Sequence, residues 1–203
     1  MKTIYARLTF TDEILGTASA DRELHSTYIA SLAPDAMSRE EEIAAIGAEE
    51  VEHNAMTVFP RDEEGNPIVW DYQIKGFFKD AASMLKKVSG THSSKIKAFK
   101  KEIDGLVFPN PRAIKIHIPE GKAMGNCQRP LRASTPMGER IALANSETCP
   151  EGSYIEIEVT VLKDDLMPAV IEWLDYGKLR GLCQWRNSGK GRFVWEQLDD
   201  LDY

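Results

Sequence analysis

The chain has few cysteines and lacks long apolar runs. Its 203 residues include only Cys127, Cys149 and Cys183, and no two of them form a Cys-x-x-Cys pair. This argues against a disulfide framework and a zinc knuckle, and it favours a reducing cytoplasm. No apolar stretch approaches the roughly 18–20 residues that a membrane span needs. The opening residues, MKTIYARLTFTDE, also lack the apolar core of a signal peptide. We therefore expect a cytoplasmic protein without a membrane partner.

The composition does not resemble that of a disordered chain. Apolar residues make up 42% of the sequence and charged residues 28%, values typical of globular proteins. The length suits one domain with a real core, and no internal repeat interrupts it. We therefore expect a single domain over residues 1–203.

Charge is distributed unevenly along the chain. The net charge is −7. Residues 1–64 hold 14 acids and five bases, whereas residues 75–101 hold eight lysines and one acid, Asp80. This asymmetry allows a basic face on an acidic molecule, although two ordinary solvated faces would give the same counts.

Hydrophobic periodicity identifies most of the elements. Apolar residues alternate with polar ones in TIYARLTF (3–10), AIKIHIP (113–119) and YIEIEVTVL (154–162), which is the pattern of half-buried strands. Helical spacing covers about 74–88 and a segment capped by Asp164 or Asp165, with Pro168 in its first turn. Further expected elements are a helix from Ser38 to about His53, a hairpin over 56–70, a short helix at 98–106, a strand at 139–145 and a last strand at 193–195.

The order of these elements predicts an α+β fold. The last 50 residues run strand, helix, glycine-containing loop, strand, which is the length of a right-handed β-α-β unit. The first strand and the 74–88 helix supply a second half. Two such halves form a ferredoxin-like antiparallel sheet with its helices on one face. The acidic region 11–72, an expected helix plus hairpin, is then an insertion into the first half.

A glycine-punctuated cationic loop precedes the last strand. In YGKLRGLCQWRNSGKGRFVWEQL (176–198), three glycines stand among five cations. Glycine serves where φ is positive or where another backbone approaches closely, and cations favour phosphate. The glycines are Gly181, Gly189 and Gly191, and the cations are Lys178, Arg180, Arg186, Lys190 and Arg192.

This loop resembles the G-h-G-x5-G-x-G loop of the RAMP superfamily, the ferredoxin-like RNA-binding proteins of CRISPR effector complexes. Cys183 stands where that pattern has glycine. The segment DYQIKGFFKDAASMLKK (71–87) resembles the start of the first helix of RAMP backbone subunits. The segment RPLRASTPMGERIALANSETCPEGSYIEIEV (129–159) resembles their basic loop and long strand. The resemblance covers about 70–197 and leaves the acidic 11–72 region without a counterpart. The chain is also similar to free-standing proteins of phages and mobile elements.

The resemblance implies non-catalytic binding of single-stranded RNA or DNA, with RNA the preferred reading, within an assembly or a homo-oligomer and without a cofactor. Cations would contact phosphates, and Trp185 would stack on a base unless it packs in the core. Arg129 and Arg132, in the expected basic loop, would otherwise form surface salt bridges. The expected contact residues are Lys75, Lys79, Lys115, His117, Arg129, Arg132, Arg180, Trp185, Arg186, Lys190 and Arg192.

Two other functions remain open on the sequence. A phage-borne RAMP-like chain with an acidic insertion would inhibit a CRISPR effector by mimicking a subunit or nucleic acid, as an anti-CRISPR protein. An endoribonuclease would use a histidine such as His92, or His25, to activate a 2′-hydroxyl. Metal binding is disfavoured, because Glu50-x-x-His53 has no second Glu-x-x-His motif to complete a di-iron site.

Overall fold

A four-stranded sheet forms the centre of the computed structural model, which describes residues 1–20, 56–135 and 138–199, without the side chains of 131–143. The strand order is β11-β1-β10-β6, and every neighbouring pair is antiparallel. The strands are β1 (Lys2–Phe10), β6 (Val107–Asn110), β10 (Tyr154–Val161) and β11 (Phe193–Leu198). In chain order this is the 4-1-3-2 arrangement of two β-α-β units.

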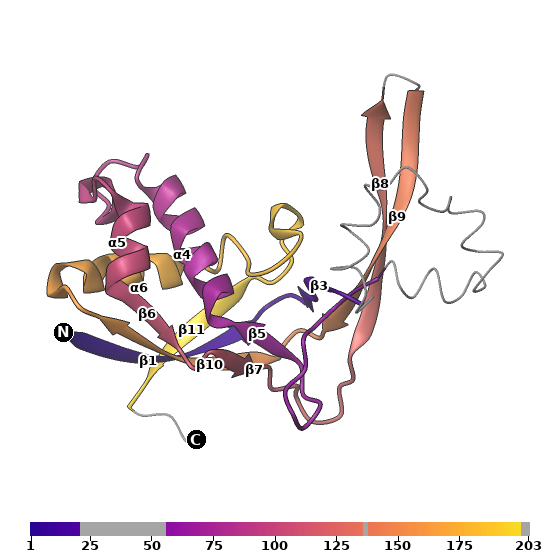
Figure 1. Cartoon of the computed structure of the whole chain (residues 1–203), viewed down its shortest axis with the longest axis horizontal. Coiled ribbons are helices and arrows are strands. Elements are labelled where there is room, and N and C mark those ends of the chain that lie inside the picture. The colour runs from indigo at the N-terminus through magenta and orange to yellow at the C-terminus, as the bar shows by residue number, and fades with distance from the viewer. Residues whose placement is uncertain (21–55, 136–137, 200–203) are drawn as a thin grey trace, which may run out of the picture.

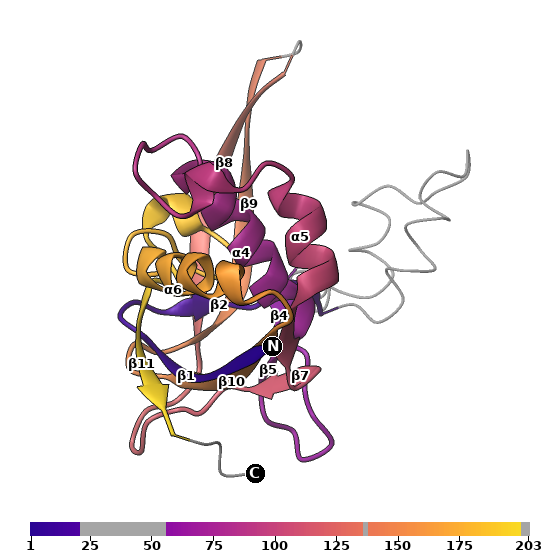
Figure 2. The same cartoon turned by 90° about the vertical axis from the view of Figure 1, so that its left-hand side faces the viewer.

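Helices connect the strands within each unit. Helices α4 (Asp71–Leu85) and α5 (Phe99–Leu106) lie between β1 and β6, and α6 (Met167–Tyr176) lies between β10 and β11. All three cover the same face of the sheet (Figures 1 and 2). The α+β class and the antiparallel sheet with helices on one face are confirmed. Of the acidic insertion, residues 21–55 lie outside the described part, including the helix expected at 38–53.

The alternating strands bury one side against the helices. In β1 the residues Ile4, Ala6, Leu8 and Phe10 are buried, and β10 buries Ile155, Ile157, Val159 and Val161 in the same way. Aromatic rings join the layers: the ring centroids of Phe77 in α4 and Phe193 in β11 are 5.2 Å apart, and those of Phe78 and Trp173 are 5.5 Å apart. This packing fixes where α4 and α6 lie on the sheet.

A second sheet extends away from the first. Strands β8 (Gly125–Thr135) and β9 (Gly138–Cys149) form a long antiparallel hairpin that projects beyond the helices (Figure 1). Three short strands pair at the base of the hairpin in the order β2-β9-β4-β3, namely β2 (Ile14–Leu15), β3 (Ala18–Ser19) and β4 (Thr57–Val58). Strands β5 (Ile68–Trp70) and β7 (Ala113–Lys115) form a separate ladder.

Several local expectations need correction. The 56–70 segment does turn tightly, with a bridge between Arg61 and Pro67, but its two arms, β4 and β5, are paired with other strands. The expected basic loop at 129–132 is part of β8, where Arg129 pairs with Ala144 and Arg132 with Ile141 of β9. Helix α4 starts three residues earlier than periodicity indicates. Its N-terminus is fixed by the Gln73 side chain, which accepts a hydrogen bond from the Trp70 amide at 2.7 Å.

Candidate nucleic-acid interface

The glycine loop is folded tightly on itself. The Leu182 amide donates to the Gly191 carbonyl at 2.9 Å, and the Gly191 amide donates to the Glu13 carbonyl at 2.9 Å. A Cβ on Gly181 would collide with the Lys190 carbonyl oxygen, and one on Gly191 would collide with that of Leu182. Gly189 and Gly191 also have positive φ, 86° and 68°. The glycines therefore let two backbone segments touch before the chain enters β11.

Two residues other than glycine share the left-handed conformation. Cys183 has φ 65° and Trp185 has φ 58°, a conformation that side chains other than glycine rarely adopt. Cys183 thus keeps the backbone that glycine would provide in the G-h-G pattern. Desolvation raises the pKa of its thiol to about 12, so it is not a reactive thiolate near neutral pH. Strain of this kind is retained where the surroundings fix the loop.

Most cations of the loop are paired within the protein. Arg180 Nε and Arg186 Nη1 lie 2.7 Å and 3.0 Å from the same carboxylate oxygen, Asp80 Oδ2 of α4. Arg180 also donates to Asn187 Oδ1 at 2.6 Å. Asp80 therefore attaches the short 3₁₀ turn η3 (Arg186–Ser188) to the helix layer.

Lys190 points toward the first strand rather than outward. Its Nζ lies 2.7 Å from Glu13 Oε1 and 3.0 Å from Asp12 Oδ1. The hydrogen bonds that Lys190 donates to Glu13 and to Asp12 raise its pKa above the usual value. This lysine holds the loop to the end of β1. Arg192, by contrast, is exposed, and no described carboxylate lies within ion-pair distance of it.

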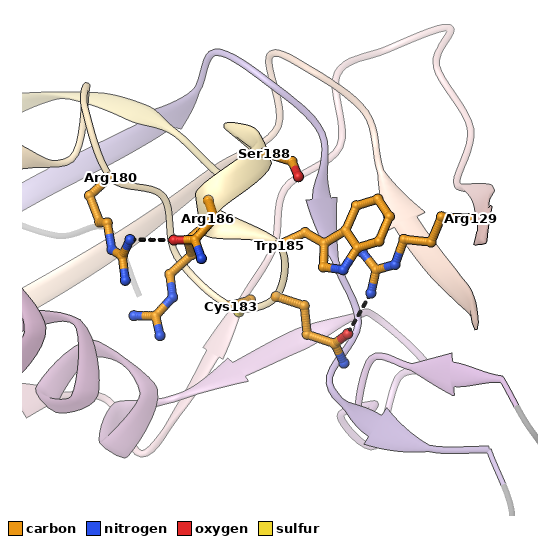
Figure 3. A pocket seen from close by; sticks show the side chains of 8 residues that line it. Arg129, Arg180, Cys183, Trp185, Arg186 and Ser188 are labelled. Atoms are coloured by element: carbon orange, nitrogen blue, oxygen red, sulfur yellow. Dashed lines mark hydrogen bonds between the residues drawn. The ribbon is translucent and has the colours of Figure 1, made fainter. Parts of the chain in front are cut away.

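Arg129 reaches the loop from the hairpin. Its guanidinium Cζ lies 3.1 Å from the centre of the Trp185 ring, and its Nη2 donates to Gln184 Oε1 at 3.1 Å (Figure 3). Gln184 in turn donates to the Gly16 carbonyl at 3.0 Å. Arginine over an indole ring is a favourable cation–π arrangement. Gln184 and Trp185 thus attach the glycine loop to the base of the hairpin.

Arg129 is a buried cation without an acidic partner. It is 6% exposed, and its Nε and Nη1 have no hydrogen-bond partner. Among the described residues no carboxylate lies within ion-pair distance of it, and desolvation lowers the pKa of its guanidinium. A buried charge left unpaired is costly. Arg129 therefore does not form the surface salt bridge that was considered for it, and its guanidinium is not exposed to solvent either.

These side chains line an open groove of about 550 Å³. Figure 3 shows it between Arg180 and Arg186 on one side and the Trp185–Arg129 stack on the other. Its lining contains three arginines, one tryptophan and no carboxylate. The lining residues are Arg129, Arg180, Cys183, Gln184, Trp185, Arg186, Asn187 and Ser188. Four of the expected contact residues therefore meet in one place.

The other expected residues lie elsewhere. Lys75 and Lys79 face α5, where Lys79 Nζ is 2.5 Å from Asp104 Oδ1 and Lys75 Nζ donates to the Asp104 carbonyl at 3.2 Å. Arg132 lies in β8, but its side chain is outside the described part.

Lys115 and His117 line a different pocket with Tyr154. Lys115 Nζ is 3.6 Å from Glu64 Oε2, and the His117 ring stacks on Tyr154 with centroids 4.6 Å apart. Burial lowers the pKa of His117. These two residues do not join the groove.

Sequence reasoning missed Asp80, Asp12, Glu13 and Gln184 as parts of this arrangement. The loop and Asp80 are about 100 residues apart in sequence, and nothing local in either segment marks the contact. Only the alternation of glycine with cations marks the region in the sequence.

The histidines and carboxylates considered for RNA cleavage or metal binding do not form a site among the described residues. His92 is exposed, its amide donates to Glu172 Oε1 at 2.8 Å, and its ring has no titratable partner among the described residues. His25 and the Glu50-x-x-His53 pair lie outside the described residues. Over 1–20, 56–135 and 138–199, no three His, Cys, Asp or Glu side chains gather as metal ligands. Within the same ranges, no helix combines the length and apolarity that a membrane crossing requires.

The fold is similar to that of a protein chain in a solved structure. The chain matches a chain in the cryo-EM structure of the Type III-B Cmr-beta bound to cognate target RNA, with a TM-score of 0.56 and 10% sequence identity. The match covers 98% of this chain and 60% of that chain, so this protein spans about 60% of the length of the other. At this identity the likeness concerns the fold alone.

The crystal structure of Cmr6 from Pyrococcus furiosus also matches, with a TM-score of 0.46 and 12% identity over 95% of this chain and 97% of that chain. No protein-family model matches the sequence, and no curated protein does.

Proposed function

We propose that the chain binds single-stranded nucleic acid, RNA in preference to DNA, in the groove at the glycine loop and without cleaving it. The observation that carries the proposal is Arg129, a buried cation in the groove wall with two unpartnered nitrogens and no described acid nearby. A buried unsatisfied group of this kind calls for a partner that the described residues do not supply. A phosphate fits, because small movements of the guanidinium over Trp185 bring an N–H group to it.

The remaining groove chemistry suits a nucleotide chain. Trp185 is half-buried in the groove lining and offers an indole ring for stacking, a contact worth about 1–3 kcal/mol per base in single-strand binding proteins. Arg180 and Arg186 stay fixed by Asp80, so they present positive charge in a defined place. Backbone and phosphate contacts of this kind do not read sequence. We therefore expect binding with little sequence preference.

The fold likeness supports RNA as the ligand and an assembly as the setting, since the similar chain belongs to a structure bound to target RNA. The interaction role as an anti-CRISPR protein, the phage origin and the homo-oligomer remain predictions, because the acidic helix expected at 38–53 lies outside the described residues. Among the described residues, the endoribonuclease alternative has only the exposed His92 in its favour.

Arg129→Gln tests the proposal. This substitution removes the buried charge and is expected to weaken binding of a labelled single-stranded RNA about tenfold, the scale of one hydrogen bond to a charged group. It is also expected to reduce the slope of log K against log salt by about 0.7, the value for one phosphate contact to a single strand. Fluorescence anisotropy over a salt series measures both.

Arg112→Gln is the matched control. Arg112 also lies over aromatic rings, with its Cζ 5.6 Å from the Tyr72 ring centre and 5.9 Å from that of Trp70, but away from the groove. It is expected to leave affinity and slope unchanged. Urea titrations check that both variants are folded. If both are folded and bind RNA equally well, Arg129 does not contact the RNA.

A further inference from the structure

Six exposed lysines gather at the end of the helix layer, outside the groove. They occupy a 21-residue segment, 81–101, that contains no aspartate or glutamate. None of them lies within ion-pair distance of a carboxylate of the described residues, unlike the loop cations tied to Asp80, Asp12 and Glu13. We call this group the lysine cap, and its members are Lys86, Lys87, Lys95, Lys97, Lys100 and Lys101.

The backbone that carries the lysine cap is fixed. Thr91 Oγ1 donates to the carbonyls of Leu85 and Val88, both at 2.9 Å, and so closes the end of α4. Lys86 Nζ donates to the Lys97 carbonyl at 2.9 Å and joins α4 to the approach of α5. The other five lysines of the cap are therefore attached to a backbone segment that these hydrogen bonds hold in place.

Helix α6 clamps the same segment. Glu172 accepts hydrogen bonds from the His92 amide at 2.8 Å, from the Ser93 amide at 3.0 Å and from Ser93 Oγ at 2.6 Å. The Trp173 indole donates to Ser93 Oγ at 2.8 Å in the core. The carboxylate that could have neutralised a lysine is thus used to position the segment.

Helix stability does not account for the positions of the lysines. Lys100 and Lys101 lie in the first turn of α5 (Phe99–Leu106), at the positive end of the helix dipole. Cations there oppose the dipole by about 0.3–1 kcal/mol each. Lys95, Lys97, Lys100 and Lys101 also crowd like charges within seven residues. A bound polyanion would relieve both effects.

The lysine cap continues a line that begins at the groove. Asp80, which holds Arg180 and Arg186, lies in α4, and Lys86 and Lys87 directly follow Leu85, the last residue of that helix. Both the glycine loop and the α4–α5 connection lie on the helix-bearing side of the sheet (Figures 1 and 2). A single-stranded nucleic acid that leaves the groove and follows α4 therefore reaches the lysine cap.

We propose that the lysine cap is a second contact surface, which takes the phosphodiester backbone of a single-stranded nucleic acid whose other part lies in the groove. The inference rests on the proposed function and extends the bound length beyond the glycine loop. Lysine is suited to this because its ammonium is a compact point charge that binds phosphate without reading sequence.

The test compares two double variants that remove the same charge. Lys87→Gln/Lys101→Gln lies in the lysine cap, and Lys2→Gln/Lys122→Gln lies outside it. Each is measured by anisotropy with single-stranded RNA of about 4 and about 16 nucleotides, the span of single-strand site sizes. We expect the cap variant to bind the long RNA about tenfold more weakly at low salt, with a slope reduced by about 1.4, and to bind the short RNA as the control does.

The outcomes separate the inference from the proposed function. If the parent protein binds neither RNA, the proposed function fails and the lysine cap loses its ligand. If the parent protein binds both RNAs and the two double variants have equal affinities and salt slopes for the long RNA, the lysine cap is not a contact surface, and binding in the groove remains supported. If the cap variant keeps parental RNA affinity but binds polyglutamate more weakly than the control, the surface serves an acidic protein, and the inference is also overturned.

Discussion

The glycine loop and the lysine cap carry positive charge in opposite ways. In the loop, Arg180, Arg186 and Lys190 form ion pairs with three acids at 2.7–3.0 Å, so their positive charge is partly neutralised within the protein. The lysines of the cap have no such partners among the described residues. The difference shows that counting cations along a sequence does not locate a binding surface, because the same residue type closes a loop in one place and remains available in another.

The largest expected effect comes from breaking the loop itself. Gly181→Ala places a methyl group against the Lys190 carbonyl and the Gly191 backbone, so the two sides of the loop have to separate. We expect a loss of about 3 kcal/mol in the free energy of unfolding, the scale of overpacking at a fixed site. Urea denaturation measures it. Gly105→Ala is the control, since a Cβ there meets nothing within 4 Å and alanine favours a helix by about 1 kcal/mol. Equal stabilities would refute the close approach.

Removing the shared acid tests whether the loop charges can be released. Asp80→Asn keeps the shape but takes the carboxylate from Arg180 and Arg186, which are 27% and 33% exposed. We expect a loss of about 2 kcal/mol in stability, together with RNA binding a few-fold tighter, because the groove gains positive charge. Asp104→Asn, at an exposed pair with Lys79, is expected to cost under about 1 kcal/mol. Weaker RNA binding by Asp80→Asn would show that position, not charge, makes these arginines useful.

A smaller effect is expected from loosening the lysine cap. Glu172→Ala removes the acceptor of three hydrogen bonds from His92 and Ser93. We expect a loss of about 1–2 kcal/mol and faster amide exchange at those two residues, since their N–H groups lose their partner. Hydrogen exchange followed by NMR measures it. Unchanged exchange would mean that the segment is held without α6. Ile171→Ala, one residue earlier on α6 and exposed, serves as the control.

Sequence patterns predicted the central fold well, for a physical reason. The period of two in β1 and β10 and the helical spacing in α4 and α6 are local consequences of burying one face. Their order along the chain then leaves few ways to form an antiparallel sheet with helices on one side. The hairpin predicted at 56–70 is present at its turn, where Arg61 forms an antiparallel bridge with Pro67. Its outer strands β4 and β5 pair with β3, β9 and β7 instead, because strand partners depend on which sheet edges are free.

The sequence by itself determined the α+β class, the glycine spacing and the places where lysines crowd without acids. Each of these follows from residues close together in the chain. Only the tertiary structure decided which cations are free. Asp80 reaches Arg180 and Arg186 from 100 and 106 residues away, and Lys190 reaches Asp12 across 178 residues. Arg129 enters the groove only because β8 pairs with β9 and leads it over Trp185. The strength of an ion pair depends on the distance between the two charges in space, not on their separation along the chain. Packing of the folded chain therefore decides which cation pairs with which acid.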